Sequence, residues 1–368
     1  MKWTVFLCVV LGCIVLCCGL TSNVDACTGL RLIAEDRGVV YGRTMEWGTF
    51  DLHSHVAVIP RGYAFQGETP DGRNGKAWQG NYGVVGLDMI GKDVIADGMN
   101  EKGLAAGLFY HPGFAVYPEY DRGKAGATIT AVDVAAYILT QCATVEEVRK
   151  KMGEVRVVGV VEDAIGIPVQ AHWMVVDASG ESIVIEFIDG AMRIFDNPLG
   201  VITNAPTYDW HMTNLRNYLN LSAVALPTKS IESMDFAPIG AGSGMIGLPG
   251  DFTPPSRFVR AVAWTQTARP VPDATEAVYE LFRILDNFNL PLGSAEGSDG
   301  EGVNLAGMRS STIWTTAWDL SGKMLYYHTQ HNRRVRMVDL NRVEFAGDEI
   351  RHVKLDESKA QDIKDITP

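Results

Sequence analysis

Cys27 is the residue whose chemistry depends most strongly on where the mature chain begins. A cut after Ala26 would give Cys27 a thiol and a free α-amine on the same residue. Reference pKa values of about 8.5 for the thiol and about 7.7–8.0 for the amine leave part of the amine neutral near neutral pH, so that it could accept the thiol proton. A nucleophile and its base would then lie in one residue, and no separate histidine is required.

Residues 1–26 have the composition of a secretory signal peptide. Lys2 supplies the positive charge, residues 4–20 form an uncharged apolar run, and small residues precede the expected cut after Ala26. A retained membrane anchor and a lipid-modified cysteine (Cys13 or Cys18) are the alternatives. We therefore expect an exported protein, periplasmic or secreted, in which residues 1–26 are removed and residues 27–368 form a single domain.

Cleavage would also change the cysteine content, because only Cys27 and Cys142 lie beyond the expected cut. Cys142 ends an apolar helical stretch, where a thiol packs as a small hydrophobic group. A disulfide between Cys27 and Cys142 is the alternative in an oxidising compartment. Six cysteines in 368 residues are too few for a disulfide scaffold.

A thiol nucleophile needs a cation that lowers its pKa, a carboxylate that holds the amine, and donors for an oxyanion. Residues 27–33 alternate as a strand does, residues 35–38 form a turn, and residues 39–42 return as a second strand. This hairpin would place Arg43 and Glu46 opposite the start of the first strand. The alternative is an ordinary cysteine, with Arg43 and Glu46 as a solvated ion pair.

The rest of the chain alternates groups of strands with pairs of helices. We expect strands near 170–177, 181–188, 191–195, 199–203, 311–319, 323–329 and 334–339, helices at 130–142, 145–152, 257–268 and 274–287, and a loop at 61–82. Thr144 with Glu147 forms a capping box, and Asp273 with Glu276 caps the last helix. Paired helices favour an α+β fold in which two antiparallel sheets pack face to face, with a helix pair on each outer face.

Composition and motifs narrow the function class. With 46% hydrophobic and 21% charged residues the chain is not disordered, and its net charge of −12 disfavours binding to nucleic acid. The GxGxxG motif at 242–247 is followed by prolines where a Rossmann helix should begin, and no GxSxG motif occurs. His53 and His55, expected on one strand face, could bind a metal, but no further ligand joins them. We therefore expect no metal and no cofactor.

Five motifs, occurring in order, resemble the choloylglycine hydrolase family, which contains penicillin V acylases and conjugated bile salt hydrolases. They are CTGL at 27–30, GRTMEW at 42–47, DGMNEKGL at 97–104, TNAPTYDWH at 203–211 and GLPGDFTPPSRF at 247–258. The resemblance extends from Cys27 to about residue 350. It implies the N-terminal nucleophile hydrolase fold, a four-layer αββα sandwich, which agrees with the order of the elements.

The resemblance also implies roles for individual residues. Cys27 would be the nucleophile and its own α-amine the base, with Arg43 close to the thiol. Asn204 would donate to the oxyanion, and Arg257 would complete the charged network. Outside the family, Asn204 is equally typical of a turn before Pro206, and Arg257 of an ion pair at the start of a helix.

Two positions bear on rate and on substrate. Glu46 stands where the family usually has Asp, and its extra methylene moves the carboxylate by about 1.5 Å. Tyr110 stands where bile salt hydrolases tend to carry Asn and penicillin V acylases Tyr. With Trp47 and Phe109, Tyr110 would form an aromatic, apolar acyl pocket. The alternative is that all three are core residues.

The resemblance therefore implies an amidase that cleaves a linear carbon–nitrogen amide bond through a thioester on Cys27. Penicillin V is the first expected substrate, a conjugated bile salt the second and an N-acyl homoserine lactone the third. Residues 213–240 match the family's assembly extension in length, which implies a homotetramer. The alternative from another class is an exported binding protein that shares the scaffold without turnover.

Overall fold

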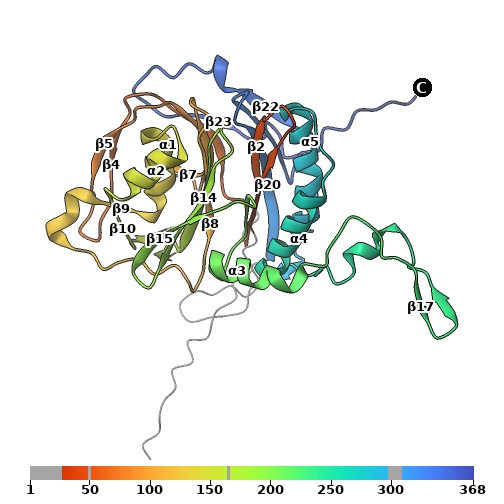
Figure 1. Cartoon of the computed structure of the whole chain (residues 1–368). Coiled ribbons are helices and arrows are strands. Elements are labelled where there is room, and N and C mark those ends of the chain that lie inside the picture. Colours follow the sequence, from red (N-terminus) through yellow and green to blue (C-terminus); the bar gives the residue numbers. More distant parts are fainter. Residues whose placement is uncertain (1–26, 49–50, 164–165, 297–308) are drawn as a thin grey trace, which may run out of the picture.

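Two antiparallel β-sheets pack face to face in the computed structural model, and helices cover both outer faces (Figure 1). The structure describes residues 27–48, 51–163, 166–296 and 309–368. The αββα sandwich expected from the order of the elements is confirmed. The predicted signal peptide, residues 1–26, lies outside the described residues.

The first sheet has seven strands and contains both strands of the predicted N-terminal hairpin. Thr28–Ile33 (β1) pairs with Val39–Trp47 (β2), and Gly29 lies opposite Arg43. The other strands are Val201–Ile202 (β16), Ala295–Glu296 (β19), Arg309–Asp319 (β20), Met324–Thr329 (β21) and Arg336–Asp339 (β22). They follow the order β16-β1-β2-β20-β21-β22, with β19 on β20.

The second sheet has eight strands in the order β15-β14-β13-β8-β7-β6-β3-β23. Their bounds are His55–Ile59 (β3), Val84–Met89 (β6), Val94–Asn100 (β7), Ala105–Tyr110 (β8), Ala171–Val176 (β13), Ser182–Ile188 (β14), Ala191–Asp196 (β15) and Arg351–Lys354 (β23). The central strands β6, β7, β8 and β13 are buried along their whole length, because the other sheet covers one face and helices cover the other.

Each outer face carries a helix pair (Figure 1). Val134–Gln141 (α1), with Val145–Met152 (α2) beside it, packs on β7 and β8, whereas Pro254–Thr267 (α4) and Ala274–Leu285 (α5) pack on the seven-stranded sheet. Both predicted caps are present. The Thr144 hydroxyl accepts from the Glu147 N–H at 3.2 Å, and the Asp273 carboxylate accepts from the Glu276 N–H at 2.9 Å.

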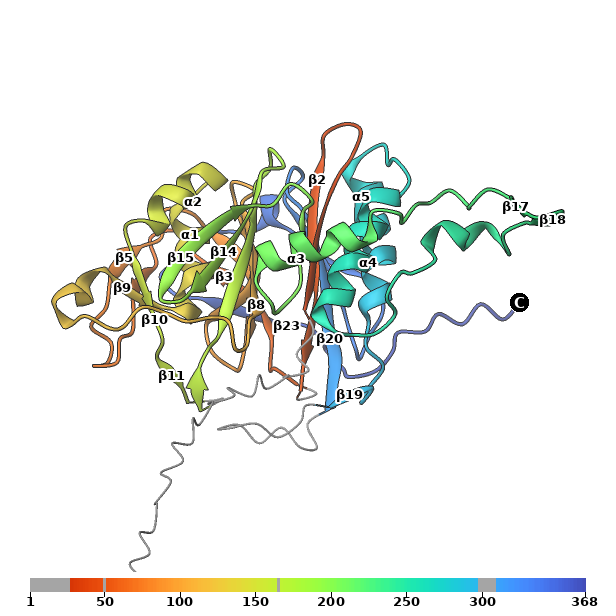
Figure 2. The same ribbon diagram turned by 60° about the horizontal axis from the view of Figure 1, so that its bottom comes forward.

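The remaining elements are short. The helix Tyr208–Asn214 (α3) leads into an arm that ends in the hairpin of Lys229–Ile231 (β17) and Met234–Phe236 (β18) (Figures 1 and 2). Further strand pairs are Ala64–Gln66 (β4) with Ala77–Gln79 (β5), Thr128–Thr130 (β9) with Arg156–Val158 (β10), and Val161–Glu162 (β11) with Ile167–Pro168 (β12). 3-10 helices lie at Arg122–Ala127, Ala131–Asp133, Leu215–Tyr218, Ala241–Met245, Asp286–Phe288 and Leu340–Arg342. Among the described residues, no helix combines the length and apolar composition that crossing a bilayer requires.

Two predictions of local structure are wrong, one about where a helix begins and one about a loop. The helix expected to begin at Arg257 begins at Pro254, because proline is well tolerated in the first helical turn, where its missing N–H would have no partner. Residues 61–82, expected to be a loop, contain the β4–β5 hairpin.

Cys142 directly follows α1 and is fully buried in the core, as expected of a thiol that packs as a small hydrophobic group. Both Cys27 and Cys142 are free, so the alternative of a disulfide between them is excluded. The expectation about two histidines is wrong. His53 precedes β3 with a φ of 51°, whereas His55 begins that strand. The two histidines therefore do not share a strand face.

Gly42 provides a test of how closely α5 packs on β2. A Cβ atom at this position would lie 2.5 Å from Leu281 Cδ2 and would press on the backbone of β20. Because backbone cannot move aside cheaply, we expect Gly42→Ala to lower the free energy of unfolding by about 1–3 kcal/mol in urea denaturation. Gly126→Ala is the control, since its Cβ would meet nothing within 4 Å. Equal stability of the two variants would contradict this packing.

Candidate active site

Cys27 lies at the start of β1, between the two sheets, and only 2% of its surface is exposed. Its backbone N–H donates to Asn204 Oδ1 at 2.8 Å. The backbone N–H of Glu46 donates to its sulfur. The pairing of β2 with β20 is irregular between Met45 and Glu46, so the ladder is locally disrupted where this N–H points at the sulfur. The nitrogen and the sulfur of Cys27 are therefore both held in place.

Asn204 and Arg257 complete a hydrogen-bond network around Cys27. Arg257, in the first turns of α4, donates from Nη1 to the Cys27 carbonyl at 2.5 Å and from Nη2 to Asn204 Oδ1 at 2.6 Å. Asn204 Oδ1 thus accepts from two donors, while its Nδ2 donates to the Tyr110 carbonyl at 2.7 Å. These partners fix the orientation of the carboxamide and leave one of its two Nδ2 hydrogens for another acceptor.

Arg43 is fully buried in β2 and reaches into the eight-stranded sheet. Its Nη1 donates to the carbonyl of Ala96 in β7 at 3.2 Å and to that of Leu108 in β8. Its guanidinium carbon lies 4.1 Å from the ring centroid of Phe109. These contacts replace the water that a buried guanidinium loses. The predicted cation is therefore present near Cys27, and it also ties the two sheets together.

The protonation state of the thiol follows from its burial. Burial raises the pKa of the Cys27 thiol, and the positive charges of Arg43 and Arg257 oppose this shift only in part. The expectation that a cation lowers the thiol pKa therefore holds for the effect of Arg43 but not for the net shift. The sulfur is held as a thiol in this site and needs a proton acceptor before it can attack a carbonyl carbon.

Glu46 acts on the thiol through its charge. Its carboxyl accepts from the hydroxyls of Thr44 at 3.1 Å and Thr312 at 2.8 Å. Burial raises its pKa to about 7, although the positive charge of Arg257 opposes the shift. The Cys27 nitrogen, which in the full chain still forms the peptide bond to residue 26, bonds to Asn204 and not to Glu46. In the uncut chain Asn204 therefore holds the Cys27 nitrogen, whereas the sequence predicted that Glu46 would hold the free amine.

An apolar cavity of about 30 Å³ opens beside Cys27. Trp47 and Tyr110, both predicted for the pocket, form part of its wall and meet edge to face with 5.6 Å between ring centroids. The other lining residues are Met45, Leu52, Met89, Ile90, Leu108 and Val169. Such a wall suits an apolar acyl group placed next to the sulfur.

Phe109 does not line this cavity, contrary to the expectation from the sequence. Adjacent residues of a strand point to opposite faces, so Phe109 faces away from Leu108 and Tyr110 and packs beneath Arg43. Sequence reasoning also missed Met45, which lies two residues after Arg43 in β2 and lines the cavity. Counting alternate residues along β8 and β2 could have predicted the orientation of Phe109 and the place of Met45.

Three possible metal ligands come together away from the sulfur, in His111, His172 and Glu186. The two imidazole rings are stacked, with 4.2 Å between centroids and 4° between planes. Their lone pairs lie in the ring planes and so run side by side instead of converging on one ion, which does not fit a tetrahedral site. No third ligand groups with His53 and His55 in the part of the chain that the structure describes.

The family model described as linear amide C–N hydrolases, choloylglycine hydrolase family, matches residues 27–356. The bile salt hydrolase/transferase of Clostridium perfringens is 32% identical over 333 residues, which cover 89% of this chain and 96% of the relative. The penicillin V acylase of Pectobacterium atrosepticum is 28% identical over 329 residues, which cover 83% of this chain and 78% of the relative.

Solved structures give the same result. The conjugated bile acid hydrolase from Clostridium perfringens superposes with a TM-score of 0.78 at 30% identity and covers 93% of this chain and 100% of its own. The penicillin V acylase from Agrobacterium tumefaciens superposes with a TM-score of 0.69 at 27% identity and covers 88% of this chain and 90% of its own. The expected N-terminal nucleophile hydrolase fold is thereby confirmed.

Two buried carboxyls predict how stability depends on pH. Burial raises the pKa values of Glu46 and Glu186 to about 7, above the ordinary value of about 4.3. Between these values each of the two carboxyls binds more protons in the folded protein than in the unfolded chain, so its contribution to the free energy of unfolding falls as pH rises. We expect each carboxyl to contribute a fall of a few kcal/mol between about pH 4 and pH 8, measured in urea denaturation as the difference between the wild type and the matched variant. The difference is needed because burial also lowers the pKa values of four histidines, which adds a rise of opposite sign: to about 3 for His111 and His172 and to about 4 for His211 and His328.

The matched variants are Glu46→Gln and Glu186→Gln, which keep the shape of the side chain but cannot ionise. Each should remove part of the slope. A slope that neither variant changes would contradict the assignment of these two groups.

Proposed function

The chain belongs to the choloylglycine hydrolase family of linear amide C–N hydrolases, and on this premise we propose that Cys27 is the nucleophile of the reaction. The observation that carries the proposal is the convergence of partners on this one residue. Asn204 bonds to its nitrogen, Arg257 to its carbonyl, and a backbone N–H to its sulfur. Arg43 adds a buried positive charge. Any buried residue needs partners for its backbone N–H and carbonyl, but a cysteine that only fills space in a core needs neither an N–H directed at its sulfur nor a buried cation near it.

The reaction begins on a chain cut after Ala26. The free α-amine of Cys27 takes the thiol proton, the sulfur attacks the amide carbon, and the carbonyl oxygen becomes an oxyanion. The unassigned Nδ2 hydrogen of Asn204 stabilises that oxyanion, and one such donor typically contributes ~10²–10³ in rate. The carbon–nitrogen bond then breaks, and the α-ammonium gives its proton to the leaving amine.

The second half of the cycle regenerates the thiol. A water molecule loses a proton to the α-amine and attacks the thioester carbon. Collapse of this intermediate breaks the carbon–sulfur bond, releases the carboxylic acid and returns the proton to the sulfur. Every step uses groups of this chain and water.

We propose an amide with an aromatic, apolar acyl group as the substrate, with penicillin V as the first candidate. Trp47 and Tyr110 present aromatic surface directly beside the sulfur. The rest of the wall is apolar, which suits an acyl group without charges. N-acyl homoserine lactones are the third candidate, because they also carry an apolar acyl chain on a linear amide.

Hydrolysis of conjugated bile salts is the second candidate, and the relatives favour it. Of the two curated relatives described above, the bile salt hydrolase/transferase is the more similar to this chain. The residue type at position 110 favours the acylase instead. A direct comparison of substrates is therefore the decisive measurement.

We further propose that the protein is exported and cut after Ala26, to act in the periplasm or outside the cell. The mechanism requires a free α-amine on Cys27, and residues 1–26 have the composition of a signal peptide. The rival from another class is an exported binding protein without turnover. Such a protein has no use for a reactive thiol at its first residue.

Substitution of Cys27 tests the proposal. We expect N-terminal sequencing of the secreted protein to begin at Cys27 and iodoacetamide to label this residue alone. Cys27→Ser should lower release of the free amine from penicillin V at least ~10³-fold, since nucleophile and base then no longer match. Cys142→Ala is the matched control, because Cys142 is also free and buried but lies at the end of α1, in the helix layer that covers the eight-stranded sheet.

The outcomes separate the alternatives. Cleavage of glycine- or taurine-conjugated bile acids with penicillin V untouched would reverse the order of the first two candidates. An unreactive Cys27 with no amide cleaved would favour the binding protein. Full activity of Cys27→Ser would exclude the mechanism.

We also propose that the predicted assembly segment, residues 213–240, takes part in a homotetramer through the arm of residues 219–246, which contains most of it. The arm projects from the body of the protein (Figures 1 and 2). Its exposed apolar side chains are Leu219, Val224, Leu226, Ile231, Met234, Phe236, Ile239 and Ile246. A cluster of exposed apolar side chains usually marks a protein interface, and a second copy of the chain is the partner that an assembly extension of this family implies.

Charged residues on the arm test this assembly. We expect the wild type to have four times the mass of one chain by light scattering after size exclusion, and Phe236→Asp with Ile239→Asp to reduce that mass, because a charge cannot be buried unpaired in an apolar interface. Val161→Asp, at an exposed apolar position outside the arm, is the control. A monomeric wild type, or a tetrameric double variant, would contradict the proposal.

A further inference from the structure

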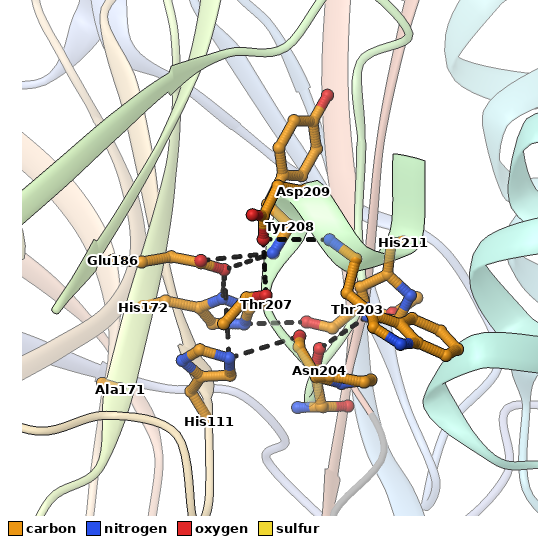
Figure 3. Close-up of polar contacts among 12 residues, drawn as sticks. His111, Ala171, His172, Glu186, Thr203, Asn204, Thr207, Tyr208, Asp209 and His211 are labelled. Carbon is orange, nitrogen blue, oxygen red and sulfur yellow. Dashed lines mark hydrogen bonds and ion pairs between the residues drawn. The ribbon is translucent and has the colours of Figure 1, made fainter. Parts of the chain in front are cut away.

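Three buried histidines surround the segment that carries Asn204, and none of them takes part in the reaction described above (Figure 3). His172 lies in β13, His111 directly follows β8, and His211 lies in α3. We propose that they are positioning residues, which hold the backbone of residues 203–206 so that the Asn204 carboxamide stays aimed at the reactive sulfur. The inference rests on the proposed function, because it depends on the role of that carboxamide.

Each histidine donates one hydrogen bond to a different backbone carbonyl of the segment. The distances from Nε2 to the carbonyl oxygen are 3.0 Å for His172 to Thr203, 3.0 Å for His211 to Asn204 and 3.3 Å for His111 to Pro206. A carbonyl oxygen only accepts, so each Nε2 must carry a hydrogen. The tautomer of all three rings follows from this single argument.

The rings themselves are held by packing from both layers. His111 and His172 stack on each other from the eight-stranded sheet, with 4.2 Å between centroids. His211 stacks on Phe258 of α4, on the side of the seven-stranded sheet, with 4.7 Å between centroids. Residues 203–206 are therefore held from two sides, so a shift of either layer would also move the backbone of Asn204.

Glu186 fixes the second nitrogen of His172. Its Oε1 lies 3.0 Å from His172 Nδ1, and its carboxyl also accepts from the Tyr208 N–H at 3.0 and 3.2 Å. Since His172 uses its Nε2 hydrogen on Thr203, the contact at Nδ1 requires one further proton. Burial raises the pKa of Glu186 to about 7 and lowers that of His172 to about 3. Burial thus disfavours the charged form of both groups, and the neutral pair is the one in which Glu186 carries the proton and donates it to His172 Nδ1.

The Nδ1 atoms of His111 and His211 show that the hydrogen bonds to the segment are made at a cost in stability. Nδ1 of His111 and Nδ1 of His211 are buried and have no hydrogen-bond partner among the residues that the structure describes. A buried polar atom without a partner destabilises the folded protein. An apolar ring would avoid that cost, but it could not donate to the carbonyls of Asn204 and Pro206.

His211 offers the sharpest test, because its bond is to Asn204 itself. His211→Phe keeps a ring against Phe258 and loses the donor, whereas His211→Gln keeps an N–H near the position of Nε2. We expect His211→Phe to lower kcat on the best substrate by about 10²-fold with little change in KM, as a misplaced transition-state donor should. His211→Gln should recover most of the loss.

Two further readouts separate positioning from a structural defect. Alkylation of Cys27 by iodoacetamide forms no oxyanion, so His211→Phe should be labelled at the wild-type rate. In the background of Asn204→Ala, His211→Phe should cause no further loss, because both substitutions remove the same donor. Losses that multiply in the double variant would overturn the inference, as would wild-type kcat in His211→Phe.

A second pair of variants covers the case in which His211→Phe does not fold. His111→Phe keeps the stack with His172 but loses the bond to Pro206, and His111→Gln keeps the N–H. The same loss of kcat and the same recovery are expected, and wild-type kcat in His111→Phe overturns the inference. If the wild type itself cleaves no amide and leaves Cys27 unlabelled, the proposed function fails instead.

Discussion

Arg257 has lost almost all contact with water, and a buried guanidinium is stable only if protein atoms take over the hydrogen bonds of its donors. Here those atoms are the Phe252 carbonyl, the Cys27 carbonyl, the Thr28 hydroxyl and Asn204 Oδ1. Burial lowers the pKa of Arg257 to about 10, and the charge of Glu46 opposes this shift. The start of β1, the carboxamide and the first turns of α4 are therefore fixed relative to one another by a single desolvated cation, since losing any one partner would leave a buried donor unpaired.

The same desolvation determines what the site holds at rest. Arg43 and Arg257 both favour an anionic sulfur, whereas burial and the Glu46 carboxyl disfavour it. A negative charge formed transiently at the sulfur or on a tetrahedral oxygen would relieve this imbalance, and low polarity makes the stabilisation stronger than it would be in water. The resting thiol and its charged surroundings are thus suited to a short-lived anion and not to a permanent one.

Local signals in the sequence predicted the parts of the fold that are determined locally. The caps at Thr144 and Asp273 start their helices where expected, and the hairpin brings Arg43 to the start of β1. Only the family resemblance predicted that Asn204 and Arg257 lie next to Cys27. They lie 177 and 230 residues from Cys27 in the chain, and no local pattern reports a contact of that separation.

The failures also have physical reasons. Phe109 was assigned to the pocket because of its residue type, although its place next to Tyr110 in a strand directs it to the other face. The three histidines around residues 203–206 come from three separate elements, so their common target becomes visible only in three dimensions. Burial, which reverses the net shift of the thiol pKa, is likewise a property of the assembled layers.

The position of the Arg43 guanidinium depends on the distance between the two sheets. The side chain begins in one sheet and ends on two carbonyl groups of the other, so the separation of the sheets sets how far the guanidinium can reach. Packed interiors resist compression and expansion alike. Substitutions in the interface between the sheets, however remote from the sulfur, will therefore alter its reactivity together with the heat tolerance of the protein. Directed evolution for thermal resilience in this scaffold should encounter that coupling early.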